Sequence, residues 1–345
     1  MTKNSLKTGP DELGYYGEGN AAMGGMAVGE TLMPALHELN EGFEAAIKDK
    51  DFLDEYAYYC KHYIGRPSPL YFAENLTKEL GGARILFKQE HLNHTGSHKI
   101  NNSLFQVLLA KRMGKKSLIC ESGAGQHYSA TAAVAAKFNM PLIGVMGEVD
   151  IARVNQNIIK AKHYGAKLKA VPGTLKEAIT DAIKTWTTNP DYAYICGSVV
   201  SANPFPKIVA FAQSIIGKEI REQSIEQEGK IPNMIVGCVG GGSNFAGAIY
   251  EFLDEASVKK IGVEAHETAV DKAIEKKCAY IFISASGGMR MMTNILSLMQ
   301  MTRMTVGINE LRKNNLPYIV IATSPTTGGL TASIASISDV CIGET

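Results

Sequence analysis

The sequence NHTGSHKINN at residues 93–102 decides how the rest of the chain is interpreted. A polar turn containing a glycine comes first, and apolar residues then recur at helical spacing from Ile100 to Leu108. Lys99 should therefore lie in the first turn of a helix, where the helix dipole disfavours a cation. If Lys99 is also partly desolvated, its neutral amine is favoured, and a neutral amine can attack an aldehyde. Without further motifs, a lysine at this place could equally be an ordinary solvated residue.

Length and composition describe a globular protein with little net charge. Its 345 residues suffice for two domains or for one large α/β unit. Apolar residues make up 45% of the chain, and 35 Lys and Arg balance 34 Asp and Glu. The chain has no excess of basic residues and no basic stripe of the kind that binds nucleic acid. Residues 1–17 hold no apolar leader, and no apolar run has membrane-spanning length. We therefore expect a cytoplasmic protein that binds neither nucleic acid nor membranes.

The six cysteines are scattered along the chain and form no CxxC pair. Cys120 and Cys238 lie in apolar, strand-like runs, a pattern typical of buried free thiols. We therefore expect a reducing compartment, with neither disulfides nor a metal site.

From residue 85 onward, short apolar runs alternate with helical patterns. The expected strands are Ile85–Lys88, Ser117–Glu121, Leu142–Met146, Ala166–Ala170, Tyr194–Gly197, Met234–Val239 and Lys260–Glu264. The expected helices cover residues 34–60, 98–112, 126–138, 151–164, 174–187 and 206–223. This alternation predicts an α/β fold with a mostly parallel sheet covered on both faces. Ligands of such sheets bind beyond the carboxyl ends of the strands.

Two further glycine-rich turns follow expected strands, where a ligand would bind. The segment ESGAGQH at residues 121–127 offers the Glu121 carboxylate and small residues that let backbone N–H groups approach an anion. The segment GGGSN at residues 240–244 precedes a helical pattern and predicts a nest of N–H donors for a phosphate. Each turn could instead be purely structural, as a tight connection or a flexible loop.

These motifs, in this order, resemble the tryptophan synthase β-subunit family. The resemblance rests on GRP at 65–67, LNHTGSHKINN at 92–102, ESGAGQH at 121–127 and GCVGGGSN at 237–244, and it covers about residues 13–265. It implies a pyridoxal-phosphate (PLP) enzyme of fold type II, in which parallel sheets are flanked by helices. The expected PLP-binding region is 1–265, with a mobile subdomain at about 114–200.

The resemblance also implies a role for each motif. Lys99 would bind the PLP aldehyde and move protons, and Glu121 would be the acid–base group at the substrate β-carbon. The PLP phosphate would be held by His98, Gly240, Gly241, Gly242, Ser243 and Asn244. The substrate carboxylate would be bound by Ser122, Gly123, Ala124, Gly125, Gln126 and His127. Arg153 and Lys176 match residues of the mobile subdomain, and Lys176 would face an α subunit.

The implied reaction joins L-serine and indole to give L-tryptophan and water. Such chemistry needs a base (Lys99), a carboxylate for the leaving hydroxyl and the indole nitrogen (Glu121), and a dry pocket. The family further implies a homodimer and a tryptophan synthase α subunit as partner.

Two of the sequence's departures from the family bear most on the expected site and fold. Tyr128 stands where glycine is usual, and its ring is expected beside the carboxylate pocket. After residue 265 the β-subunit pattern stops, and about Asp271–Glu344 resembles the carboxyltransferase β subunit of acetyl-CoA carboxylase, on Gly pairs at 287–288 and 328–329 among others. We therefore expect residues 266–345 to form a crotonase-like β/α fragment in place of the family's C-terminal third.

Three hypotheses follow from these resemblances. The first is a PLP-dependent β-replacement lyase, impaired by the missing C-terminal third. The second is a catalytically inactive fusion, or chimera, that binds PLP or a partner only. The third, a carboxyltransferase component of acetyl-CoA carboxylase, is disfavoured because the matching segment is incomplete.

Overall fold

The computed structural model describes residues 15–16, 23–26, 28–152, 154–263, 270, 273–286, 305–326 and 337–343. The chain divides into two units, each of which is described by itself. The large unit comprises Val28–Ile235 and Gly241–Lys260, and the small unit comprises Met1–Ala27, Val236–Gly240 and Ile261–Thr345. This division differs from the single boundary near residue 265 expected from the sequence, and that boundary stays a prediction.

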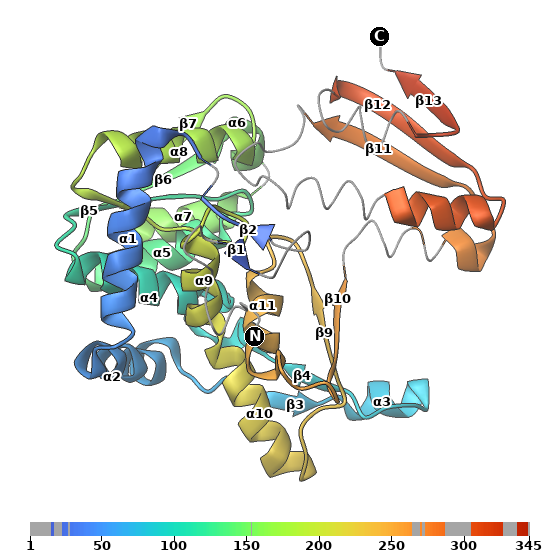
Figure 1. The fold of residues 1–345 in the computed structure, drawn as a ribbon, viewed down its shortest axis with the longest axis horizontal. Helices are drawn as coiled ribbons and strands as arrows, with labels where there is room; N and C mark the ends of the chain where they lie inside the picture. Colours follow the sequence, from blue (N-terminus) through green and yellow to red (C-terminus); the bar gives the residue numbers. More distant parts are fainter. Residues whose placement is uncertain are drawn as a thin grey trace. The chain divides into compact units, whose positions relative to one another are not determined.

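A four-stranded parallel sheet in the order β7-β6-β5-β8 organises the large unit (Figure 1). Its strands are β5 (Ser117–Glu121), β6 (Leu142–Gly147), β7 (Lys167–Val171) and β8 (Tyr192–Tyr194). The bounds of β5 are those predicted, but β8 ends where the prediction had a strand begin, at Tyr194. The reason is that the Gln106 side chain accepts from the Cys196 N–H and donates to the Cys196 carbonyl, so these groups bond to a side chain rather than to a strand.

The helices follow the predicted pattern with local breaks. Their bounds are α1 (Met33–Ala46), α2 (Lys50–Tyr59), α3 (Glu74–Leu80), α4 (Lys99–Arg112), α5 (Gln126–Lys137), α6 (Glu148–Ile151), α7 (Asn155–His163), α8 (Leu175–Thr188), α9 (Phe205–Gln213), α10 (Ile215–Glu228) and α11 (Ser243–Ile249). The single helix predicted at 34–60 is wrong, because Asp49 caps α2 by accepting from the N–H groups of Asp51 and Phe52. The helix predicted at 206–223 likewise divides, at Ser214.

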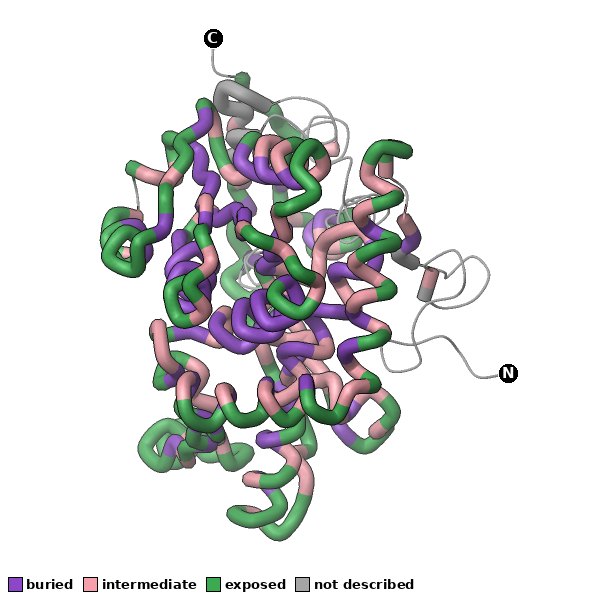
Figure 2. The backbone as a smooth tube through the Cα atoms, turned by 90° about the vertical axis from the view of Figure 1, so that its left-hand side faces the viewer, coloured by how far each residue is buried: buried purple, intermediate pink, exposed green. Residues whose placement is uncertain are grey.

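Helices cover both faces of the sheet, as predicted. Leu118 and Cys120 of β5 pack into a core that α4, α5 and α7 share. Ile119, which points the opposite way, packs with residues of α1 and α8. Figure 2 shows buried residues concentrated on the inner helices and strands, with exposed residues on the outer turns.

Two short pairs of strands lie outside this sheet. β3 (Leu70–Phe72) pairs antiparallel with β4 (Leu86–Lys88). β9 (Met234–Cys238) pairs with β10 (Lys259–Val263), each within one residue of the predicted strand. The glycine-rich segment 240–244 therefore follows a strand, as the sequence predicted.

The small unit holds a parallel sheet of β11 (Tyr280–Ser286), β12 (Tyr318–Thr326) and β13 (Val340–Gly343). The Tyr280 ring stacks on Tyr318 with centroids 5.5 Å apart. Helical residues 305–313 contribute Ile308 and Leu311 to the same core. The small unit also includes β1 (Tyr15–Tyr16) and β2 (Met23–Gly24), which pair antiparallel. The Gly pairs at 287–288 and 328–329 lie outside the described residues.

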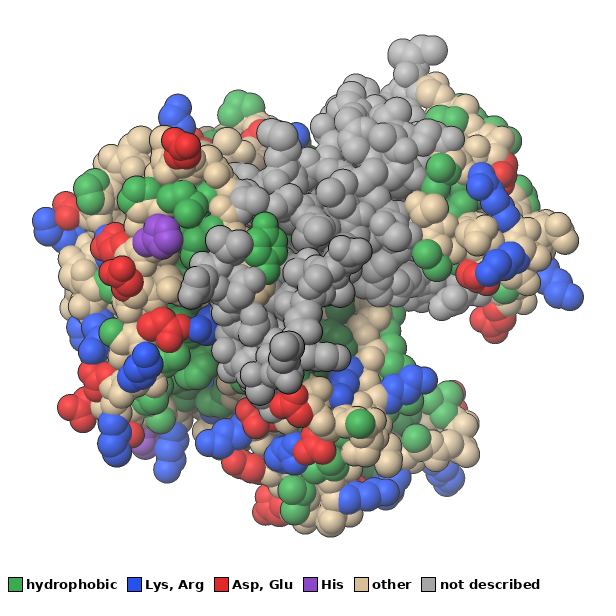
Figure 3. Space-filling model, viewed as in Figure 1, with side chains coloured by type: hydrophobic (Ala, Val, Ile, Leu, Met, Phe, Trp, Pro, Cys, Tyr) green, Lys and Arg blue, Asp and Glu red, His purple; other side chains and the backbone are tan. Residues whose placement is uncertain are grey.

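Charged side chains of both signs are interspersed on the surface. In Figure 3, acidic and basic groups alternate across the described part of the face shown.

No described helix is long and apolar enough to cross a bilayer. Among the residues that the structure describes, no three His, Cys, Asp or Glu groups gather as metal ligands would. All six cysteines are free, but Cys238, Cys278 and Cys341 are exposed, so the expectation of a buried thiol at Cys238 is wrong.

Candidate active site

Lys99 is the first residue of α4, so it lies in the first turn of a helix as the sequence predicted, although this helix begins one residue later than expected. The turn before it reverses through two positive φ angles, 76° at Thr95 and 84° at Gly96. Thr95 is β-branched, and such residues rarely adopt this conformation, so the turn stores backbone strain of about 1–3 kcal/mol. Strain of this kind is found mainly at functional sites.

The Lys99 amine lies in a desolvated place. Its Nζ donates a hydrogen bond to the carbonyl oxygen of Gly197, just beyond β8. Burial lowers the pKa of Lys99, while the acidic groups of Cys196 and Glu121 act weakly in the opposite direction. The neutral amine is therefore favoured, which is the form that attacks an aldehyde.

Glu121 ends β5 and is only 8% exposed. Its charge acts on Lys99 and on Cys196, so the carboxylate and the amine share one low-dielectric region. The next residue, Ser122, is also buried, and its N–H donates to the Val145 carbonyl at 3.2 Å. The predicted acid–base residue thus lies at the carboxyl end of a central strand, where ligands of parallel sheets bind.

The segment from Ser122 to His127 forms the turn that leads into α5. Gly125 is the N-cap of α5 with φ of 75°, and a Cβ atom there would lie 2.7 Å from Cβ of Asn157. Asn157 Nδ2 also donates to the Ala124 carbonyl at 2.8 Å. Asn157 of helix α7 therefore packs against this turn and fixes it. Ala124 and Gln126 of the same turn are exposed.

His127 holds the same turn from inside. Its Nε2 donates to the Ile195 carbonyl at 2.8 Å, and a Cβ on Gly197 would lie 2.7 Å from its ring. Burial, with a smaller effect from Lys99, lowers the pKa of His127 to about 3. The ring is therefore neutral and acts through packing and its one N–H donor.

The glycine-rich segment meets the Lys99 turn within the large unit. Gly242, with φ of 80°, is the N-cap of α11, and Ser243 Oγ lies 3.3 Å from His98 Nε2 in a hydrogen bond. Ser198 Oγ donates to the Gly241 carbonyl at 2.7 Å. Burial, followed by the Lys99 charge, lowers the pKa of His98 to about 4, so His98 is neutral. Asn244 is the second residue of α11, and Gly240 belongs to the small unit.

The structure brings together most of the predicted residues and adds several. Sequence reasoning missed Ser198 and Asn157, although Ser198 follows an expected strand and could have been suspected there. It also missed the buried charges around Arg66, which lies in the GRP motif at residues 65–67. Lys176 is exposed on α8, and Arg153 lies outside the described residues.

The Tyr128 ring packs in the core against β6. Tyr128 is fully buried, and a Cβ atom on Gly144 would lie 2.2 Å from its ring. The expected position of this ring beside the carboxylate pocket stays a prediction. The ring thus occupies the space that a side chain at position 144 of β6 would need. A bulky residue at 128 is accommodated because its neighbour has no side chain.

Comparison with known proteins adds two findings. A family model described as "Pyridoxal-phosphate dependent enzyme" matches residues 62–301, a match that continues past the expected junction at 265–271. The tryptophan synthase beta chain of Pseudomonas syringae pv. syringae (strain B728a) is 50% identical over 278 residues, which cover 79% of this chain and 67% of that protein. That of P. syringae pv. tomato (strain ATCC BAA-871 / DC3000) is 51% identical over 275 residues, with 79% and 66% covered. The chain thus spans about two thirds of the length of these relatives.

Solved structures show the fold alone. A threonine deaminase from T.th. superposes with a TM-score of 0.50 at 24% identity, over 70% of this chain and 69% of that chain. Diaminopropionate ammonia lyase from Escherichia coli, in complex with its aminoacrylate-PLP azomethine intermediate, gives a TM-score of 0.54 at 15% identity, over 64% and 61%.

Proposed function

Because this chain belongs to the family of pyridoxal-phosphate dependent enzymes, we propose that it catalyses β-replacement as tryptophan synthase β subunits do. The cofactor is pyridoxal 5'-phosphate, the substrates are L-serine and indole, and the products are L-tryptophan and water. The observation that carries this proposal is the desolvated Lys99 amine at the start of α4, in the electrostatic range of a buried Glu121.

The described residues fit this cofactor. A buried lysine whose pKa is lowered is the group that an aldehyde needs as partner. Ser243 and the neutral His98 meet where a phosphate would be held, next to the exposed backbone of Gly241. When bound, PLP supplies an electron sink for carbon acids of the substrate. We assign the phosphate to His98 and to the segment Gly241–Asn244 of the large unit, and the role of Gly240, which belongs to the small unit, stays a prediction from the sequence.

This chain's own groups would then act in sequence. Lys99 Nζ takes the proton from Cα of L-serine, and the Glu121 carboxyl gives a proton to the leaving hydroxyl oxygen. Glu121 then removes the proton from the indole nitrogen as C3 of indole bonds to the β-carbon. Loss of the C3 proton is balanced by return of a proton to the indole nitrogen, and Lys99 returns its proton to Cα, which completes L-tryptophan. In the turn from Ser122 to His127, the Ser122 N–H already donates to the Val145 carbonyl, so the backbone N–H groups of the following residues bind the substrate carboxylate and thereby orient the Cα–H bond.

Two partners belong to the same proposal. A tryptophan synthase α subunit would contact the surface around Lys176, which is exposed on α8, and a second copy would complete a homodimer. We also propose a cytoplasmic location, on the ground that all six thiols are free.

The chief alternative is a catalytically inactive chimera that binds PLP only. In that case residues 266–345, with their proposed crotonase-like fold, act as packing and not as an enzyme. The three-stranded β11-β12-β13 sheet has a core of its own, so a packing role has a structural basis. The carboxyltransferase activity itself has the weaker support, because the family model for PLP enzymes extends to residue 301.

The test uses the full chain loaded with PLP. Tryptophan formation from L-serine and indole is measured for the wild type and for Glu121→Gln, with the visible PLP band as the measure of loading. We expect Glu121→Gln to keep the band but to lose about 10²–10⁴-fold in tryptophan formation, because a positioned acid–base group typically contributes that much. A wild-type chain that holds the band and makes no tryptophan would establish the inactive alternative.

A further inference from the structure

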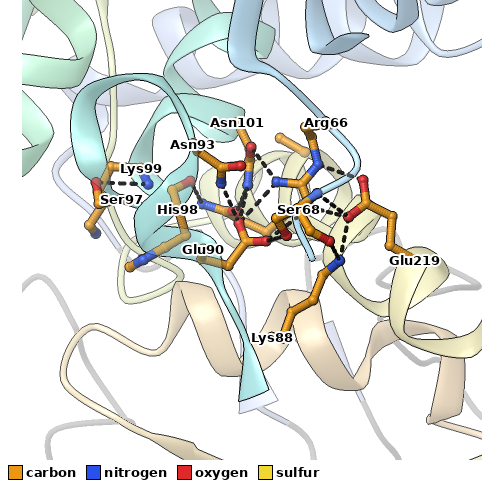
Figure 4. A network of polar contacts seen from close by, with 12 residues as sticks. Arg66, Ser68, Lys88, Glu90, Asn93, Ser97, His98, Lys99, Asn101 and Glu219 are labelled. Carbon is orange, nitrogen blue, oxygen red and sulfur yellow. Dashed lines mark hydrogen bonds and ion pairs between the residues drawn. The ribbon is translucent and has the colours of Figure 1, made fainter. Parts of the chain in front are cut away.

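A buried cluster of charges lies directly beside the Lys99 turn (Figure 4). Arg66 donates through Nε and Nη2 to Glu219, at 2.8 and 2.7 Å, and through Nη1 and Nη2 to Glu90, at 2.9 and 3.0 Å. Nη1 donates its remaining proton to Asn101 Oδ1 at 2.9 Å. All five N–H donors of the guanidinium are therefore used.

The cluster carries no net charge. Lys88 joins it by donating to Glu219 Oε2 and to the Ser68 carbonyl, both at 2.6 Å, so two cations face two carboxylates. Although burial alone would raise it, the Arg66 charge lowers the pKa of Glu90 to about 2. Desolvation offsets much of the attraction in such buried pairs, so their use is often to specify one geometry rather than to add stability.

The geometry that Glu90 specifies is that of the turn carrying Lys99. Glu90 Oε2 accepts from Asn93 Nδ2 at 2.8 Å and from Asn101 Nδ2 at 3.1 Å. Asn93 precedes the strained turn at Thr95, and Asn101 is two residues beyond Lys99. One carboxylate oxygen therefore fixes the chain on both sides of Lys99.

Gln213, the last residue of α9, fixes the same turn at a third point. It is 0% exposed, and its Nε2 donates to the His98 carbonyl at 3.0 Å. Its Oε1 accepts from Asn101 Nδ2 at 3.0 Å. Gln213 thus spans from the residue directly before Lys99 to the network that Glu90 and Arg66 form.

We propose that Gln213, acting with Glu90, is a positioning residue for Lys99: it holds the His98 carbonyl and so aims the Lys99 amine at the cofactor aldehyde. This inference rests on the proposed function, in which Lys99 is the residue that binds PLP. A positioning role is needed because reacting groups must be held within about 0.5 Å of their productive geometry. A turn with two positive φ angles is strained, so contacts from outside the turn must stabilise its conformation.

The test compares two matched variants of the full chain, Gln213→Met and Gln223→Met. Gln223 lies on α10 in the same buried network, but its amide bonds to Lys88 and to the Ser68 carbonyl, away from Lys99. Three quantities are measured: the Kd for PLP from its visible band, the pH midpoint of that band, and the melting temperature without PLP.

Gln213→Met removes both hydrogen bonds of the amide, and we expect loss of the one to the His98 carbonyl to weaken PLP binding by roughly threefold to tenfold and to move the pH midpoint of the band. Gln223→Met should leave the Kd and the midpoint unchanged, even where it lowers the melting temperature as much. If Gln213→Met does not fold, Gln213→Asn gives the same comparison, because it keeps the amide but is too short to span both partners.

The inference is overturned if Gln213→Met binds PLP with the wild-type Kd and pH midpoint, or if Gln223→Met changes them equally. In both cases the network only stabilises the fold, and the proposed function is untouched. If PLP does not link to Lys99 in the wild type, the proposed function fails and this inference falls with it.

Discussion

Replacing Gly144 with alanine should destabilise the large unit by about 3 kcal/mol, the upper end of the usual cost of overpacking. The new Cβ atom would lie 2.2 Å from two atoms of the Tyr128 ring and 2.8 Å from a third. Neither the Tyr128 ring nor the backbone of Gly144 can move away, because Tyr128 is 0% exposed and Gly144 belongs to β6, which pairs with a strand on each side. For a unit of this size, the melting temperature should fall by about 6–12 °C.

The assay is thermal unfolding of the PLP-free chain, followed by circular dichroism, with two companions. Gly29→Ala is the control, because its nearest neighbour to a new Cβ atom is 3.9 Å away. The double variant Gly144→Ala with Tyr128→Ala should cost less than the two single variants together, since the clash is then absent. A Gly144→Ala chain with the melting temperature of the wild type, or strictly additive effects in the double variant, would show that Tyr128 is not accommodated in this way.

Two further predictions concern stability. Tyr128→Phe should leave the urea midpoint unchanged or raise it, because the buried Tyr128 hydroxyl has no hydrogen-bond partner among the described residues and its desolvation costs about 1–3 kcal/mol. A clear loss of stability would show that a partner exists. The pKa of Glu90 is about 2 in the folded chain against an ordinary value of 4.5, so its contribution to stability is present above about pH 4.5 and is lost as pH falls towards 2. Glu90→Gln should therefore flatten the pH dependence of the unfolding free energy in that window, and an unchanged slope would contradict it.

Features set by local pattern could be predicted from the sequence. Helix α4 begins within one residue of its predicted start and β5 spans Ser117–Glu121 as expected, because both follow from the spacing of apolar residues and from the turn before them. The parallel sheet with helices on both faces follows from the same alternation.

Features set by distant partners could not be predicted. The Arg66 guanidinium meets Glu219, which is 153 residues away in the chain, and nothing near Arg66 in sequence indicates that pairing. The end of β8 depends on the Gln106 side chain of α4. The Tyr128 ring turns into the core only because a glycine lies opposite it on β6. In each case tertiary packing overrides the local signal.

The central claim is that Lys99 is the residue that binds PLP. Its most direct test is borohydride reduction of the PLP-loaded chain, then peptide mapping of the reduced adduct, with Lys99→Ala as control. The desolvated amine at the start of α4 predicts that the pyridoxyl label is found on Lys99 and is absent from the variant. A label on another lysine, or no label at saturating PLP, would contradict the account.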